Sequence, residues 1–352
     1  MRRFCLATVF AAGIGIFAAM GFAAQQSSPT GPYKVLKAAK VGGDGGFDYV
    51  YADAAGRRLY VPRSGPAGRI TVFDLDNLAP IGEIPNATGH GVAVDPKSNH
   101  GFLTSKPIVM FDSKTLAMIK TIEVQGNPDG ILFDPFNQRV YDLSHIAPNV
   151  TVIDSTNGSV VGTIDLGGMP EQAVTDGKGH LYIDIEDKGK IAVVDAETMK
   201  VTATYDLAGK GGTCAGLALD IKNNILFATC RNPKNMVILS ADDGKIITTL
   251  PIGTGTDGAV FNSSTMEAFS SHADGTLTVV KENSPADFVV EQNVETMVSA
   301  KTLSLDSKTN RVLLIAAEFG PPPATLPEGT PPGRPVRGPM LPGSFSILVV
   351  GK

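Results

Sequence analysis

One phrase recurs seven times along this chain of 352 residues: an apolar stretch, a polar turn residue, a short turn, and a second apolar stretch that carries an aromatic residue. Clear copies are AVDPKSNHGFLTS, LFDPFNQRVYDLS and LALDIKNNILFATC. The turn residue falls at Asp53, Asp95, Asp134, Asp176, Asp220, Asn262 and Asp306. A period of about 40–45 residues built from short strands is typical of a β-propeller with one blade per repeat. The sequence therefore predicts an all-β fold, a seven-bladed β-propeller of four-stranded blades.

The blades are expected to start near residues 46, 88, 127, 169, 212, 255 and 298. We name the four strands of a blade A to D in chain order. The last repeat stops after its third strand at the C-terminus, whereas residues 33–41 have the character of an outer strand and precede the first repeat. Because an open ring would leave an unpaired edge, we expect the segment 33–41 to complete the last blade. The propeller would then occupy residues 33–352.

Two features of the repeat have structural explanations. The turn acid is expected to bond the backbone of its own turn. An aromatic residue follows it by seven positions in most blades, and a large ring at a fixed place in each blade is typical of packing between neighbouring sheets. We prefer this interpretation to a surface that stacks nucleic-acid bases.

The first 24 residues have the pattern of a signal peptide. Arg2 and Arg3 precede an apolar run that ends at Met20, and small residues follow before Gln25. We expect export to the periplasm or secretion, with no membrane span once the peptide has been removed, and a monomer. The chain is mildly acidic, with a net charge of −5 and 18% charged residues, which argues against a polyanion partner.

The residue five positions before each turn residue lies where strand A begins, on the face that surrounds the central channel. The seven residues there are Asp48, His90, Asp129, Glu171, Ala215, Asp257 and Lys301. Converging carboxylates repel one another, so they must hold a cation, share protons or be solvated. Ca²⁺ would use several of the oxygens, and a transition metal would use His90 with a carboxylate. The alternatives are a solvated channel mouth, a bound cation, and a small cationic or polyol ligand.

The loops between strands B and C lie on the same face and add further candidates, among them His145, Arg231 and His272. The candidate metal ligands are Asp48, His90, Asp129 and Glu171. No H-x-x-x-H spacing is present, so a zinc site is only weakly indicated.

The two cysteines of the mature chain, Cys214 and Cys230, are centred on the turn of the fifth repeat. They are expected to face each other across its first hairpin, where Cα atoms come close enough for a disulfide. The alternatives are two free buried thiols or two soft metal ligands.

Nine of the 24 prolines lie between Pro321 and Pro342. Proline removes ladder donors, so residues 320–343 are expected to form an extended or irregular loop of the last blade. Two interpretations stay open: a surface excursion, or a lid that carries Arg334 and Arg337 over the acidic mouth.

The repeat resembles the YVTN-type repeat of YncE-like seven-bladed propellers, in RRLYVPRSGPAGRITVFD, KGHLYIDIEDKGKIAVVD, GNPDG and GGMPE. The resemblance covers residues from about 33 to 352. It implies an exported bacterial propeller, similar in fold to lactonases and to the propeller parts of quinoprotein dehydrogenases. One branch of the family binds single-stranded DNA. This chain departs from that branch, since it has no Trp and its isoelectric point is near 5.6.

Two classes of function compete. The first is a non-enzymatic scaffold that binds a small molecule, a cation or a protein at the channel mouth. The second is a hydrolase or lactonase in which Asp129 or Glu171 acts with His90 or His145. Single-stranded DNA binding is the weakest alternative. The chain has no nucleophile elbow and no Gly-rich phosphate loop, which favours the scaffold.

Overall fold

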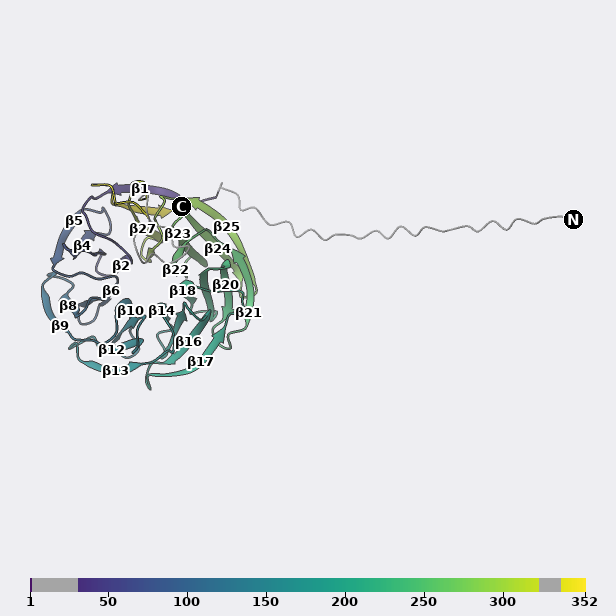
Figure 1. The fold of residues 1–352 in the computed structure, drawn as a ribbon, viewed down its shortest axis with the longest axis horizontal. Coiled ribbons are helices and arrows are strands. Elements are labelled where there is room, and N and C mark those ends of the chain that lie inside the picture. The colour runs from purple at the N-terminus through teal and green to yellow at the C-terminus, as the bar shows by residue number, and fades with distance from the viewer. Residues whose placement is uncertain (2–30, 323–336) are drawn as a thin grey trace.

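The computed structural model describes residues 1, 31–322 and 337–352, and in these it is built of β-strands arranged as a ring of seven antiparallel four-stranded sheets (Figure 1). Each sheet is one blade, with strand A beside the central channel and strand D on the outer rim. The seven repeats of the sequence thus correspond to seven blades. Residues 2–24 of the expected signal peptide and residues 323–336 of the proline-rich loop lie outside the described residues. Among the described residues there is no helix of the length and apolar character needed to cross a membrane.

The first three blades consist of strands β2 to β13. Blade 1 contains β2 (Tyr51–Asp53), β3 (Arg58–Arg63), β4 (Arg69–Asp74) and β5 (Pro80–Pro85). Blade 2 contains β6 (Val92–Asp95), β7 (His100–Leu103), β8 (Ile108–Asp112) and β9 (Met118–Ile122). Blade 3 contains β10 (Pro128–Asp134), β11 (Arg139–Ser144), β12 (Val150–Asp154) and β13 (Val160–Ile164).

The next three blades consist of strands β14 to β25. Blade 4 contains β14 (Pro170–Thr175), β15 (His180–Ile185), β16 (Lys190–Asp195) and β17 (Lys200–Asp206). Blade 5 contains β18 (Cys214–Asp220), β19 (Ile225–Arg231), β20 (Lys234–Ser240) and β21 (Ile246–Pro251). Blade 6 contains β22 (Thr256–Asn262), β23 (Glu267–His272), β24 (Thr276–Ser284) and β25 (Asp287–Glu295).

Blade 7 combines the two ends of the propeller. It contains β26 (Leu303–Asp306), β27 (Arg311–Ala316), β28 (Ser346–Gly351) and, as its outer strand, β1 (Lys34–Lys40), which pairs antiparallel with β28. The ends are also fastened to blade 6 through the fully buried carboxylate of Glu267, which accepts hydrogen bonds from the Tyr33 hydroxyl and from Lys352 Nζ at 2.7 Å. The first and last residues of the ring therefore bind the same side chain.

The core lies between neighbouring sheets, because each blade buries both of its faces. The aromatic residue of strand B fills this space: Tyr60, for example, is fully buried in blade 1 and its ring centroid lies 5.7 Å from that of Phe111 in blade 2. Phe227 of blade 5 stacks on Phe261 of blade 6 at 5.2 Å. The aromatic column is thus a packing feature, as the sequence indicates.

The turn residue of every repeat has a local structural role. The side-chain oxygen of each one accepts a hydrogen bond from a backbone N–H of its own turn, at 2.7 to 3.2 Å. These short-range bonds stabilise the tight A–B turns and account for the strongest periodic signal in the sequence. The turn residues lie on the face opposite the channel mouth, which is described next.

Candidate functional site

Strand A begins irregularly in four blades, and this irregularity directs side chains to the channel. In blades 3 to 6 the register of β10, β14, β18 and β22 against strand B shifts by a β-bulge within the first four residues. Bulges bend a strand and re-aim its side chains. Asp129, Glu171 and Asp257 all lie in these bulges, whereas Asp48, His90 and Lys301 lie in the connections that precede strand A of their blades.

In four of the seven blades a glycine follows the residue that is five positions before the turn residue. These glycines let the A strands approach one another around the axis. The four are Gly91, Gly130, Gly216 and Gly258. A Cβ at Gly130 would lie 2.5 Å from the carbonyl oxygen of Glu171, closer than atoms can pack. Two of the remaining blades have large residues instead, Tyr49 and Gln172.

These two exceptions bridge the channel. The Tyr49 hydroxyl of blade 1 donates to Glu171 Oε1 of blade 4 at 3.4 Å. The Gln172 amide of blade 4 accepts hydrogen bonds from the backbone N–H groups of Leu217 and Ala259 in blades 5 and 6, and donates to the Ala259 carbonyl. Sequence reasoning missed both residues. The signal that would have found them is the break in the glycine pattern.

The polar side chains at the mouth contact one another in a series in which acidic and basic groups alternate. We call this set of side chains the mouth ring. Its members, in order of contact, are Glu186, Arg231, Asp257, Lys301, Asp48, His90, Asp129, His145 and Glu171. The carboxylates converge as the sequence suggests, but in this order of contacts a basic side chain separates each carboxylate from the next. Interleaved opposite charges thus relieve much of the expected repulsion.

One half of the mouth ring contains the permanent cations. Arg231 contacts both Glu186 and Asp257, and Lys301 contacts Asp257 and lies 2.9 Å from Asp48. Asp257 is almost fully buried, with 6% of its side chain exposed. Burial opposes the charge of Lys301, but the two carboxylates outweigh it and raise the Lys301 pKa. This half is a set of partly buried ion pairs in which two cations contact three carboxylates.

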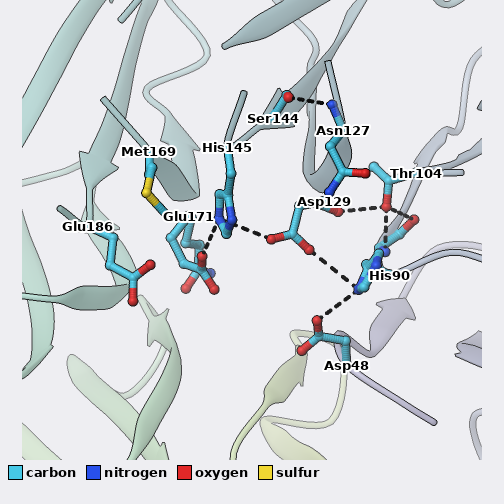
Figure 2. Close-up of polar contacts among 12 residues, drawn as sticks. Asp48, His90, Thr104, Asn127, Asp129, Ser144, His145, Met169, Glu171 and Glu186 are labelled. Carbon is cyan, nitrogen blue, oxygen red and sulfur yellow. Dashed lines mark hydrogen bonds and ion pairs between the residues drawn. The ribbon is translucent and has the colours of Figure 1, made fainter. Parts of the chain in front are cut away.

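The other half contains histidines in place of Lys and Arg (Figure 2). Nδ1 of His90 lies 3.0 Å from Asp48 Oδ2 and 3.5 Å from Asp129 Oδ1. Nε2 of His145 lies 3.2 Å from Asp129 Oδ2 and 2.9 Å from Glu171 Oε2. Asp129 therefore lies between the two imidazoles and presents one oxygen to each, as Figure 2 shows.

The groups of the histidine half titrate away from their ordinary values. The hydrogen bond to Glu171 raises the pKa of His145 to about 9, and burial raises that of Glu171 to about 7. The hydrogen bond to Asp48 raises the pKa of His90. Burial and the negative charge of Asp48 raise the pKa of Asp129. At neutral pH this half therefore holds protons that a positively charged ligand would displace.

The remaining sequence candidates are not members of the mouth ring. His272 is fully buried beside the mouth and bonded to Ser270 and Thr276, and burial lowers its pKa to about 4, so it stays neutral and outside the mouth ring. Ala215 contributes no polar group. Arg337 packs its guanidinium over Phe319 at 5.1 Å, at one end of the proline-rich loop. Arg334 lies outside the described residues, so a lid formed by that loop stays a prediction.

Cys214 and Cys230 form a disulfide across β18 and β19. Both cysteines are buried beneath the mouth, so as a bonded pair they are not available as soft metal ligands.

The histidine half contains two groups of three residues whose ligand atoms lie within 4.8 Å of one another: Asp48, His90 and Asp129, and Asp129, His145 and Glu171. Each offers one imidazole nitrogen and two carboxylate oxygens, a donor set that suits Zn²⁺ and its neighbours in the first transition row. Ca²⁺ prefers an all-oxygen set, so the intervening histidines make it the poorer match.

Comparison with known proteins finds relatives over part of the sequence and solved structures of similar fold. No family model matches the sequence. Two curated relatives named YncE, from Salmonella typhi and Salmonella typhimurium strain LT2, are each 30% identical over 134 residues, which is 35% of this chain and 37% of the relative. The matched region thus spans little more than a third of the relatives' length.

Two solved structures share the fold. A chain of a mitotic checkpoint complex superposes with a TM-score of 0.68 and 9% identity, covering 88% of this chain and 95% of that one. U3-55K superposes with a TM-score of 0.70 and 11% identity, covering 90% and 98%. At such identities the likeness shows the fold alone.

The fold and the mouth ring define a seven-bladed β-propeller with a charged channel mouth. The partial match to YncE, together with the seven blades, supports a YncE-like propeller family for this chain.

Proposed function

We propose that this protein is an exported binding scaffold that takes a divalent transition-metal ion at the histidine half of the mouth ring. The observation that carries the proposal is the position of Asp129, whose two oxygens lie 3.5 and 3.2 Å from His90 and His145. Both distances exceed the 2.7–2.9 Å or so of a charge-assisted hydrogen bond. A proton on either imidazole thus satisfies Asp129 poorly, whereas a cation between these atoms would be held by all of them.

Access and charge support the same site. The side chains of His90 and His145 are 44% and 28% exposed, so an ion can enter from solvent. Blades 2 to 4 contribute no Lys or Arg to the mouth ring, and the permanent cations Arg231 and Lys301 are confined to blades 5 and 7. The histidine half is therefore the part of the mouth where added positive charge meets the least repulsion.

Export is supported by the signal-peptide pattern of residues 1–24 and by the disulfide, since disulfides persist in oxidising compartments. The test of localisation is the N-terminal sequence of the protein recovered from the periplasm or medium of a bacterial host. We expect mature protein to begin near Gln25. Full-length protein confined to the cytoplasm would contradict export.

The test of the binding function is calorimetric titration of the mature protein with Zn²⁺, Mn²⁺ and Ca²⁺. We expect saturable binding of a transition metal, weaker binding of Ca²⁺, and release of protons. Asp129→Asn removes a direct ligand and should weaken binding by about 100-fold or more, since even an outer-shell partner of a ligand contributes about 10–100-fold. The matched control is His180→Gln, which removes a histidine that lies 2.9 Å from Asp176 on the opposite face. Equal loss in both variants, or no saturable binding, would contradict the proposal.

A further inference from the structure

The two groups of ligands at the mouth share one residue, Asp129, and each group uses a different oxygen of its carboxylate. Asp129 Oδ1 belongs to the group with Asp48 and His90, whereas Asp129 Oδ2 belongs to the group with His145 and Glu171. The groups are therefore related through a single carboxylate that faces both. Figure 2 shows this arrangement as a row in which Asp129 lies in the middle.

The spacing within each group matches the edges of a metal coordination sphere. Two ligand atoms bound about 2.1 Å from one ion are separated by about 3.0 Å at a right angle and about 3.4 Å at a tetrahedral angle. The distances from His90 Nδ1 to its two carboxylate oxygens are 3.0 and 3.5 Å, and those from His145 Nε2 are 2.9 and 3.2 Å. In each group the two distances from the imidazole therefore suit ligands of one ion, and the two carboxylate oxygens lie within 4.8 Å of each other.

From this geometry we infer that the mouth holds a dinuclear centre in which Asp129 bridges two divalent first-row transition-metal ions. The inference deepens the proposed function and rests on it. One ion takes Asp48, His90 and Asp129 Oδ1, and the other takes Asp129 Oδ2, His145 and Glu171. A carboxylate that binds one ion through each oxygen is the bridge expected for two metals about 3.5–4 Å apart.

The surroundings suit a pair of ions more than a single one. With metal bound and the protons displaced, the three ligand carboxylates would carry three negative charges against two neutral imidazoles. Lys301, 2.9 Å from Asp48, offsets part of that charge. Glu186, itself paired with Arg231, lies beside this half at the end of the mouth ring (Figure 2). Tyr49 approaches from the channel side, where its hydroxyl contacts Glu171. With three protein ligands per ion, each metal keeps positions open toward solvent, which is where a small oxyanion or carboxylate ligand would bind.

Metal content is the first test. Mature protein loaded with Co²⁺ or Zn²⁺ and passed through a desalting column should contain about two equivalents by elemental analysis. His90→Gln and His145→Gln should each lower the content to about one, and Asp129→Asn should reduce both sites. His180→Gln should keep the wild-type content. One equivalent in the wild type would overturn the bridge and leave the proposed function standing, and no bound metal would overturn both.

Magnetic coupling is the second test, and its decisive readout comes from the wild-type protein. Two Mn²⁺ ions bridged by a carboxylate give a spin-coupled electron paramagnetic resonance spectrum, distinct from that of isolated ions. We expect the coupled spectrum in fully loaded wild-type protein, and isolated-ion spectra in His90→Gln and in wild type loaded with about half the metal if the sites fill unequally. Two equivalents of Mn²⁺ without coupling would overturn the inference.

Discussion

The Tyr49 hydroxyl lies 3.4 Å from Glu171 Oε1 and thereby joins blade 1 to blade 4 across the channel. The two residues are 122 positions apart in the chain and are not in neighbouring blades. Most contacts in a propeller join successive blades, so a cross-channel bond is an additional constraint on the ring. It also fixes the orientation of a carboxylate that belongs to the mouth ring.

Removing this hydroxyl should cost stability without changing the fold. Tyr49→Phe is expected to lower the free energy of unfolding by about 0.5–1.5 kcal/mol, because it keeps the ring but removes the hydroxyl that donates to both the carbonyl oxygen and Oε1 of Glu171. Urea denaturation measures the change. Tyr182→Phe is the matched control, since the Tyr182 hydroxyl in β15 makes no hydrogen bond with the described residues. If Tyr49→Phe is as stable as wild type and leaves metal affinity unchanged, the cross-channel bond has no role.

Lys301 should be among the most sensitive residues of the mouth. It contacts Asp257 and lies 2.9 Å from Asp48, and those carboxylates are 6% and 25% exposed. Lys301→Met removes the cation that the two carboxylates share, and breaking a buried pair typically costs about 3–5 kcal/mol. We expect a loss near the lower end, because Arg231 still neutralises Asp257. The free energy of unfolding from urea titration measures it.

The double variant Lys301→Met/Asp257→Asn provides the control for that prediction. It also removes the negative charge of Asp257, which Lys301→Met leaves without its lysine partner. The double variant should therefore recover part of the lost stability. A strict sum of the two single losses would show that the pair is not coupled and would contradict the electrostatic explanation.

The repeat made the fold accessible from sequence, because its regular positions have local causes. The turn acids bond their own backbone and the aromatic residues pack between sheets, so both signals recur at fixed spacing. The convergence of Asp48, His90, Asp129, Glu171, Asp257 and Lys301 followed from the same alignment of repeats.

The pairing of those residues could not be derived in the same way. Which carboxylate meets which base depends on side-chain reach across the channel, and on loops such as those that carry His145 and Glu186. His272 seemed equivalent to His145 from its position after the turn, but it is fully buried and bonded to neighbours in its own blade. Spacing along the chain specifies the face of a blade and not the depth of a side chain.

Asp142 should make stability depend on pH. It is fully buried in β11, and burial together with the charge of Asp129 raises its pKa to about 8. In the unfolded chain an Asp titrates near 3.9 or so. Between these values the folded state binds more protons than the unfolded state, so this residue lowers stability as pH rises from about 4 to about 8.

Asp142→Asn tests this sign, since it keeps the shape and cannot ionise. In chelator-containing buffer the variant should match wild type near pH 4 and exceed its stability at pH 8, by an amount on the order of a few kcal/mol. Asp287→Asn, at an exposed position on the outer rim, should show no such trend. A variant less stable than wild type at pH 8 would contradict the assignment of Asp142 as a carboxyl that stays protonated near neutrality.

The disulfide between Cys214 and Cys230 should contribute substantially to stability. The cysteines are 16 residues apart, and a loop of that size restricts the unfolded chain by about 3 kcal/mol. Cys214→Ala/Cys230→Ala should lose about that amount, and a reducing agent should lower the stability of wild type towards that of the variant while leaving the variant unchanged. Mass spectrometry of protein unfolded in alkylating agent without reductant provides the direct check. We expect no alkylated cysteine in the mature chain, because both thiols are bonded, and two alkylated cysteines would show that the pair is free.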